Sequence, residues 1–299
     1  MYVPKQSNPA LAACLTLAAA AFAAGTTLLA KALGTGALGD IELGAPLHPL
    51  QISHGRFLFA LLAVGMVAAA LRPTLEGIHW RLHVGRSALG WGGVTLMFAA
   101  AAFIPLSDAA AISFLNPVFG MMLAIPFLGE KVGPVRWSAA LIALVGALIL
   151  TRPGAGSVQL GAVLALGAAL FFGAELIFIK LLSGRESPLQ VLLINNVIGT
   201  VLATAAVIPV WQAPTGAQWA ALAGIGGLMA CAQACFVNAM ARADASFVAP
   251  FFYAALVFAA LYDAVFFLVL PDAISVAGGL VILFGAGLLA WRQARVQRS

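Results

Sequence analysis

Ten long runs of apolar residues fill most of the chain, and they constrain its fold more than any other feature. A helix needs about 20 residues to cross the hydrocarbon core of a bilayer. Of the 299 residues, 63% are hydrophobic and 8% are charged, whereas soluble domains carry about 25% charged residues. A water-soluble enzyme is excluded, because a chain of this size cannot bury so much apolar surface in water. We therefore expect an all-α integral membrane protein with short loops.

Clusters of charged residues, proline and glycine separate the apolar runs, as at Arg72-Pro73 and Arg152-Pro153-Gly154. Backbone groups in hydrocarbon must be satisfied within their own segment, so each run is expected to be a helix. The first run is longer than the core of a signal peptide and is expected to be retained. The predicted transmembrane helices are 10–32, 50–71, 86–104, 107–128, 134–151, 158–182, 189–209, 218–240, 245–269 and 273–291.

The placement of basic residues predicts the orientation, because Lys and Arg concentrate on the cytoplasmic side of membrane proteins. With the N-terminus in the cytoplasm, the outer loops carry only Arg152. Both termini are then cytoplasmic, and the net charge of +5 reflects topology rather than a nucleic-acid partner. The basic residues assigned to the inner side are Lys5, Arg72, Arg81, Arg86, Lys131, Arg136, Arg185, Arg242, Arg292, Arg295 and Arg298.

The two halves of the chain resemble each other. Residues 12–33 and 161–182 align without gaps with eight identities, among them Phe22 with Phe171 and Lys31 with Lys180. The second predicted helix of each half follows the same tripeptide, Pro-Leu-Gln. Five helices per half is an odd number, so the second copy enters the membrane from the opposite side. We therefore expect two inverted five-helix repeats, 1–155 and 156–299, an architecture typical of secondary transporters.

Several segments resemble the EamA module of the drug/metabolite transporter superfamily. The segments that carry the resemblance are Gly25–Lys31, Arg56-Phe57, Ala110–Phe119 and Phe127–Lys131 in the first half, with Gly173, Lys180 and Asp244 in the second. The second half departs from the pattern at Val265-Phe266, where the family has Gly-Glu-Lys. In overall character the chain is similar to the YddG-type bacterial exporters of amino acids, aromatic ones included. The resemblance implies a ten-helix carrier of small metabolites in a bacterial inner membrane.

Polar groups inside a bilayer are costly and are expected to face a cavity or a partner. Glu175 has aromatic neighbours in sequence and is a candidate contact for a substrate ammonium or a proton-coupling carboxylate; a salt bridge with Lys180 is the alternative. Arg56 is a candidate for holding a substrate carboxylate bidentately, or else a structural anchor near the outer surface. His54 is a possible coupling group because histidine titrates near neutral pH, with a satisfied structural histidine as the favoured alternative.

A second set of candidates lies deeper in the predicted helices. Pro117 frees a backbone carbonyl near Ser113 and places Asn116 at a bend of the fourth helix. The remaining candidates would line a cavity suited to apolar or aromatic side chains, although stripes of aromatic residues more often serve packing. These substrate-binding candidates are Trp91, Phe98, Asn116, Glu175, Gln233 and Tyr253.

Lys31 and Lys180 are expected to cap the last turns of their helices at opposite membrane faces, with gating as the alternative. Asp263 is a further candidate for a buried carboxylate, with a solvated position near the outer end of its helix as the alternative. Cys14, Cys231 and Cys235 have no further ligands near them in sequence, so no metal or cofactor is expected.

The sequence favours a secondary transporter over the other classes of membrane protein. No Gly-x-Ser-x-Gly or His-Glu-x-x-His motif is present to indicate a membrane-embedded enzyme, which stays the alternative of a different class. The expected function is export of small metabolites, most specifically amino acids, across the inner membrane by alternating access. Export of other small metabolites or of drugs is the runner-up. The expected partners are the lipid bilayer and the substrate; the sequence predicts no oligomeric state.

Overall fold

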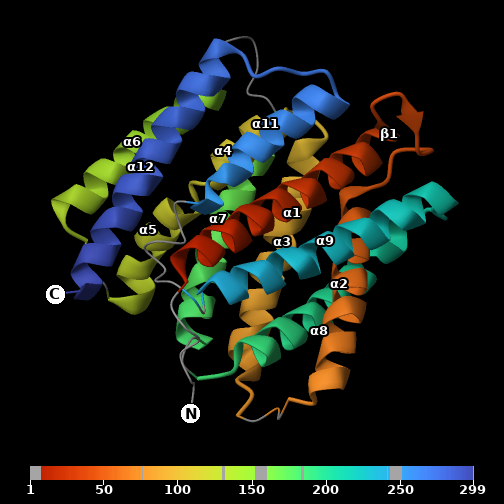
Figure 1. The fold of residues 1–299 in the computed structure, drawn as a ribbon, viewed down its shortest axis with the longest axis horizontal. Helices are drawn as coiled ribbons and strands as arrows, with labels where there is room; N and C mark the ends of the chain where they lie inside the picture. Colours follow the sequence, from red (N-terminus) through yellow and green to blue (C-terminus); the bar gives the residue numbers. More distant parts are fainter. Residues whose placement is uncertain are drawn as a thin grey trace.

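The computed structural model of the protein describes residues 8–73, 75, 77–129, 132–151, 160–182, 185–240, 242 and 251–298. Over these residues the chain forms a bundle of helices with one short β-hairpin (Figure 1). Glu130, Lys131 and Asp244, three residues of the family resemblance, lie outside the described residues.

The first half contains six helices and the hairpin. The hairpin pairs Ala37 with Glu42 and Leu38 with Ile41. Proline opens several of these helices, since its fixed φ suits the first turn and its missing N–H is not needed there. The elements are α1 (Pro9–Thr35), β1 (Ala37–Leu38), β2 (Ile41–Glu42), α2 (Pro49–Leu71), α3 (Trp80–Ala101), α4 (Leu106–Ser113), α5 (Asn116–Leu128) and α6 (Pro134–Thr151).

The second half begins with α7 (Leu160–Leu182) and α8 (Pro188–Val207), followed by the short 3-10 helix η1 (Ile208–Val210). It continues with α9 (Gly216–Met240), α11 (Ala254–Phe266) and α12 (Ala273–Arg298). Ser187 caps α8, because its hydroxyl accepts a hydrogen bond from the Gln190 backbone N–H.

Six helices of the described part are long and apolar enough to cross a membrane, and three more apolar helices are shorter. The six are Ala10–Thr35, Pro49–Leu71, Leu106–Leu128, Leu160–Leu182, Pro188–Val210 and Gly216–Met240. Over the described residues the fold is all-α apart from the hairpin. Nine of the ten predicted spans coincide with these apolar helices, α4 and α5 together forming one of them, whereas the third predicted span corresponds to α3, which is not among them. Residues 245–250 of the ninth predicted span lie outside the described residues. Ten membrane crossings in two inverted repeats stay a prediction.

The predicted span 107–128 is broken into α4 and α5 at Phe114 and Leu115. Pro117 lies in the first turn of α5, where its missing N–H leaves the carbonyl of Ser113 without its helical partner. The predicted bend is thus a break, with Asn116 as the first residue of the new helix.

The predicted span 86–104 begins too late in sequence. Helix α3 starts at Trp80, so Arg86 lies almost two turns inside it and is 8% exposed, rather than in an inner loop. The orientation argument used Arg86 as a loop cation, and this use was wrong.

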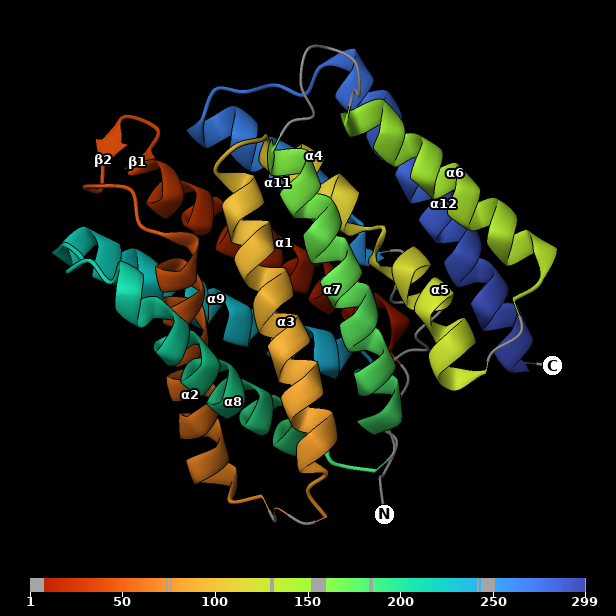
Figure 2. The same cartoon turned by 180° about the vertical axis from the view of Figure 1, so that it is seen from behind.

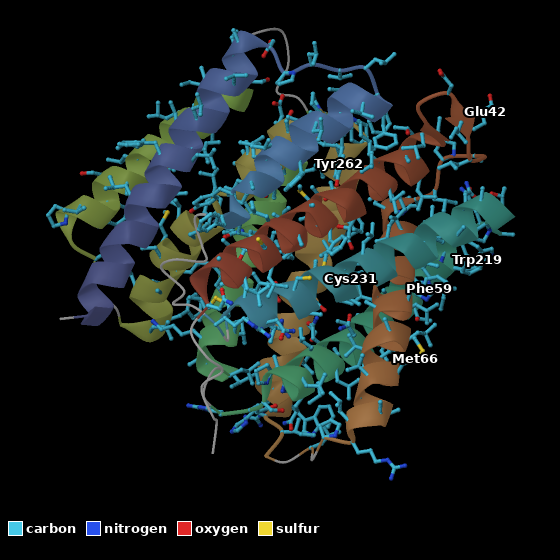
Figure 3. The ribbon with its side chains drawn as sticks, viewed as in Figure 1. Glu42, Phe59, Met66, Trp219, Cys231 and Tyr262 are labelled. Atoms are coloured by element: carbon cyan, nitrogen blue, oxygen red, sulfur yellow. The ribbon has the colours of Figure 1, made fainter. Side chains whose placement is uncertain are left out.

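Helices of one half pack against helices of the other throughout the bundle. Helix α3 lies beside α7, as Figure 2 shows, and α1 lies beside α9 and α11. Helix α2 lies against both α8 and α9, and α6 lies against α12 (Figure 1). At the α2–α9 contact Phe59 lies edge-on to Trp219, 6.2 Å between ring centres, while Met66 points away from the bundle (Figure 3).

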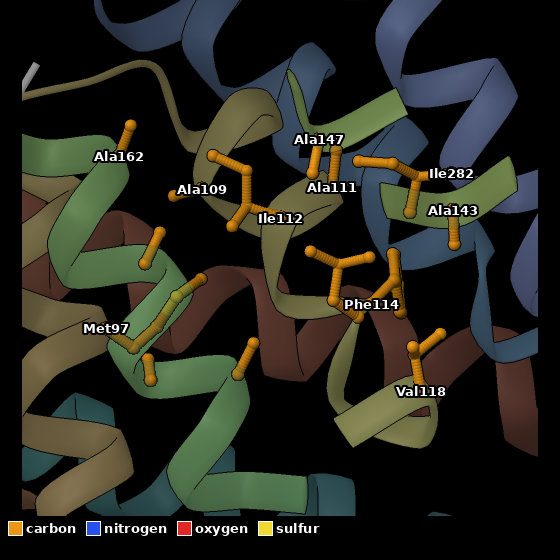
Figure 4. Close-up of a cluster of buried hydrophobic side chains, with 14 of the residues drawn as sticks. Met97, Ala109, Ala111, Ile112, Phe114, Val118, Ala143, Ala147, Ala162 and Ile282 are labelled. Atoms are coloured by element: carbon orange, nitrogen blue, oxygen red, sulfur yellow. The ribbon is translucent and has the colours of Figure 1, made fainter. Parts of the chain in front are cut away.

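The largest cluster of buried apolar side chains lies where α4, α5, α6, α7 and α12 meet (Figure 4). Small residues dominate it, and they let the helix backbones approach closely. Ile112 and Leu115 fill it at the α4–α5 break, and Ile282 of α12 packs against Gly146 of α6. This part of the bundle is a packed core.

Candidate substrate-binding site

Two arginines and one glutamate come together inside the helix bundle. Arg86 of α3 and Glu175 of α7 form an ion pair, with 3.4 Å between Nε and the Oε1 oxygen. Arg56 of α2 interacts electrostatically with Glu175 as well. Arg56 is 6% exposed, and its guanidinium lies over the ring of Phe57. We call Arg56, Arg86 and Glu175 the charge cluster; it joins two helices of the first half to one of the second.

Glycines of α3 make room for the side chains of α7 around this cluster. A Cβ atom at Gly90 would lie 3.0 Å from the carboxyl carbon of Glu175. A Cβ atom at Gly85 would collide with Phe178, and one at Gly93 would collide with Phe172. Because α3 has no side chain at these positions, α7 places its carboxylate and aromatic rings directly against the α3 backbone.

Further polar contacts hold α3 against α8. The Arg86 Nη1 donates a hydrogen bond to the Val191 carbonyl at 3.3 Å. The Ser87 hydroxyl donates to the Asn195 Oδ1 at 3.1 Å, and both residues are buried. Asn195 of α8 thus lies beside the α3 segment that carries Arg86.

A second ion pair joins the halves near the β-hairpin. The Lys31 ammonium donates to the Asp263 Oδ1 at 2.8 Å, and it lies 4.4 Å from the centre of the Phe267 ring. The other carboxylate oxygen accepts a hydrogen bond from the Ser107 backbone N–H. Asp263 is fully buried, which confirms it as a buried carboxylate and excludes the solvated alternative. Lys31 pairs with Asp263 and does not serve as a cap for its own helix.

A third polar cluster lies at the start of α3 and α8, at the far end of α2 from the hairpin. The Glu186 carboxylate accepts hydrogen bonds from the ring nitrogens of His79 and His83, at 3.0 and 2.7 Å, and from the Gln190 amide at 2.7 Å. The His79 backbone N–H also donates to it. Burial alone would raise the pKa of Glu186, but these hydrogen bonds outweigh it and lower the pKa to about 2.

Of the residues predicted for the site, Arg56 and Glu175 lie together in the charge cluster. Trp91 lies one residue after Gly90 on α3, and its indole nitrogen is buried without a partner among the described residues. Gln233 lines an apolar groove of about 530 Å³ between α2, α8 and α9. Lys180 lines a smaller cavity of about 150 Å³ between α5 and α7.

The structure places the other predicted residues apart from the charge cluster. Phe98 is 3% exposed in a packed core, Tyr253 lies edge-on to Phe114 at the start of α11, and His54 lies edge-on to Trp211. The backbone carbonyl of Asn116 faces Gly173 of α7. Substrate contact by these residues stays a prediction.

The sequence reasoning missed Arg86 as a site residue and the Glu186 cluster altogether. The signal for Arg86 was the run of glycines that follows it on α3, which marks a close helix contact. The two histidine partners of Glu186, His79 and His83, are more than a hundred residues away in sequence, and no local pattern connects them to it.

A family model decides what kind of protein this architecture belongs to. The model of the EamA-like transporter family matches residues 10–152 and 159–291. The chain belongs to the EamA-like transporter family. It is thus a membrane transporter of the drug/metabolite transporter type, and the relatives of this EamA-like chain are named as transporters rather than as enzymes.

The curated relatives of this EamA-like chain carry different substrates. A riboflavin transporter of Vibrio cholerae is 29% identical over 87% of this chain and 88% of its own length. A riboflavin transporter of Rhizobium johnstonii is 36% identical over 65% of this chain and 64% of its own length. An S-adenosylmethionine uptake transporter of Rickettsia bellii is 26% identical over 81% of this chain and 83% of its own length.

A solved crystal structure has the same fold. It matches this EamA-like chain with a TM-score of 0.63 at 18% sequence identity, covering 95% of this chain and 99% of the other. None of the relatives named here is an amino-acid exporter, so the prediction of amino-acid export gains no support from them.

Proposed function

We propose that the protein is a secondary transporter whose substrate docks at the charge cluster, with riboflavin as the first substrate to test. The observation that carries this proposal is the cluster itself: Arg56, Arg86 and Glu175 are enclosed among helices of both halves. Charges buried in a membrane bundle typically mark the path of a substrate or ion. Two of the relatives reported above are named as riboflavin transporters, which sets the first choice of substrate.

The contacts between helices support the proposed inverted repeat, with 1–155 and 156–299 as its two units. We number the predicted spans from one to ten, so that α1, α3 and α7 are spans one, three and six. The repeat makes α1 equivalent to α7, and α9, the eighth span, equivalent to α3. The α1–α9 contact is therefore equivalent to the α7–α3 contact, and both contacts are present. The α1–α11 contact is likewise equivalent to the α7–α4 and α7–α5 contacts. Such an equivalence is what alternating access between two related units requires.

Two polar contacts are proposed as gates at opposite ends of this path. Lys31 and Asp263 join α1 to α11 near the hairpin, and His79 and His83 join α3 to Glu186 before α8. Each contact links the two halves of the chain. Rocking of one unit against the other breaks one set of contacts while the other holds. With the predicted orientation in a bacterial inner membrane, both termini and Glu186 are cytoplasmic.

Amino acids are the second candidate substrate. A zwitterion would place its carboxylate between the guanidinium groups of Arg56 and Arg86 and its ammonium against Glu175. This arrangement fits the amino-acid export that the sequence suggested. Amino-acid binding differs from riboflavin binding because it needs a negatively charged carboxylate on the substrate.

Counterflow in proteoliposomes tests the proposal. Labelled riboflavin is expected to accumulate transiently in vesicles preloaded with unlabelled riboflavin, with saturation, and amino acids are expected not to compete. Arg56→Gln should lower the rate of counterflow at least tenfold, while Leu62→Ala, an exposed position of the same helix, should leave it unchanged. Accumulation driven by amino acids alone would replace riboflavin by the second candidate, and a chemically altered product would indicate an enzyme.

A further inference from the structure

The buried side-chain atoms of the charge cluster that lack a hydrogen-bond partner are donors on its two arginines. The atoms without a hydrogen-bond partner in the described part of the chain include Nε and Nη1 of Arg56, Nε of Arg86 and Nε1 of Trp91. Buried donors without acceptors are costly, and a guanidinium group has no acceptor capacity of its own. A substrate that fits here must therefore offer acceptors, and it must offer more than one.

One acceptor lies within this set of donors. Glu175 interacts electrostatically with Arg86 and with Arg56, and Arg86 Nε lies 3.4 Å from its Oε1. Gly90 packs against the carboxyl group on the α3 side, so a larger side chain there would displace it. The cluster thus combines hydrogen-bond donors on Arg56 and Arg86 with an acceptor on Glu175.

We propose that the charge cluster is a specificity site for a cyclic imide edge, in which an N–H group lies between two carbonyl groups. Arg56 and Arg86 donate to the two carbonyl oxygens, and Glu175 accepts the hydrogen bond from the N–H. The inference rests on the proposed function, since the isoalloxazine ring of riboflavin carries such an edge at its C2 carbonyl, N3–H and C4 carbonyl. The inference goes beyond the proposed function because it names the edge of the substrate that the protein recognises by hydrogen bonds.

Aromatic side chains of α7 lie beside the charge cluster. Phe178 lies against Gly85, and Phe171 and Phe172 lie against Gly92 and Gly93, on either side of the Glu175–Gly90 contact. Flat aromatic substrates gain by stacking on such side chains and by burying apolar area. An amino acid has neither an imide edge nor a large ring system. Riboflavin and amino acids would therefore form different hydrogen bonds and apolar contacts at the charge cluster.

An analogue series separates the imide inference from the proposed function. Riboflavin, N3-methylriboflavin and an analogue altered only at the 8-methyl group compete for counterflow of labelled riboflavin into proteoliposomes. A hydrogen bond to a charged group corresponds to roughly tenfold or more in affinity. The N3-methyl analogue is therefore expected to compete at least tenfold more weakly than riboflavin, whereas the 8-altered analogue is expected to stay within about threefold of it.

The outcomes are distinct. Equal competition by riboflavin and its N3-methyl analogue overturns the imide inference and leaves riboflavin transport standing. Absence of saturable riboflavin counterflow in wild-type vesicles overturns the proposed substrate, and the imide inference with it.

Variants test whether the Glu175 side chain recognises the N3–H group. In the Glu175→Ala protein, riboflavin and N3-methylriboflavin are expected to compete about equally well, because the carboxylate that accepts the hydrogen bond from N3–H is absent. Leu170→Ala, an exposed position of the same helix, should keep the full preference for riboflavin. If the Glu175→Ala protein still prefers riboflavin over N3-methylriboflavin tenfold, a residue other than Glu175 recognises the N3–H group. The analogue series in the wild-type protein stands by itself if this variant does not reach the membrane.

Discussion

Glu186 is the residue whose chemistry the structure defines best outside the spans. Hydrogen bonds from His79, His83 and Gln190 stabilise its charged form and hold its pKa at about 2, below the ordinary value of 4.5. A carboxylate with a lowered pKa stabilises the folded protein at every pH above the pKa of the unfolded state. That stabilisation is lost as the pH falls from about 4.5 to about 2.

Glu186→Gln is therefore expected to remove one component of the pH dependence of stability. The wild-type protein in detergent should lose part of its thermal stability between pH 4.5 and pH 2, and the variant should lose less over the same range. Glu42→Gln, an exposed position of the hairpin, serves as the control. Thermal melts at a series of pH values measure the effect, and parallel curves for wild type and Glu186→Gln would contradict the assigned hydrogen bonds.

At the scale of helices, close contacts depend on glycines at particular positions. Gly226 of α9 packs directly on α2, where an added Cβ would lie 2.3 Å from the Phe59 Cβ and 2.7 Å from the Ala60 backbone nitrogen. The next residue, Gly227, has no atom within 4 Å of the same hypothetical position. The two neighbours thus make a matched pair.

Gly226→Ala is expected to destabilise the protein by about 1–3 kcal/mol, because the added methyl group forces α9 away from α2. Gly227→Ala is expected to be neutral or stabilising by up to about 1 kcal/mol, since alanine is the better helix former. Thermal midpoints of the two variants in the same detergent provide the comparison. Equal midpoints would show that the α2–α9 contact is looser than described.

The sequence predicted the helices well and their polar contacts poorly. Long apolar runs predict helices because backbone groups in hydrocarbon must form their hydrogen bonds within their own segment. The position of Pro117 correctly predicted the α4–α5 break. Arg86 was misplaced because α3 extends past the apolar run into a stretch with Arg81 and His83. The Lys31–Asp263 pair spans 232 residues, a separation over which no local pattern predicts a partner.

At the scale of the whole molecule, the account depends on the two halves being threaded through the membrane in opposite senses. The loop that contains Asp40 follows the first helix of the first half, and the loop that contains Arg185 follows the first helix of the second. Inverted repeats place these equivalent loops on opposite sides of the membrane. Parallel repeats place them on the same side.

Cysteine labelling of these two loops tests that claim most directly. Asp40→Cys and Arg185→Cys are introduced one at a time into a protein whose Cys14, Cys231 and Cys235 are replaced, and intact cells are treated with a membrane-impermeant thiol reagent. We expect labelling of the Asp40→Cys protein in intact cells, and of the Arg185→Cys protein only after the membrane is opened. Labelling of both proteins from the same side would contradict the inverted repeat and the alternating-access mechanism built on it.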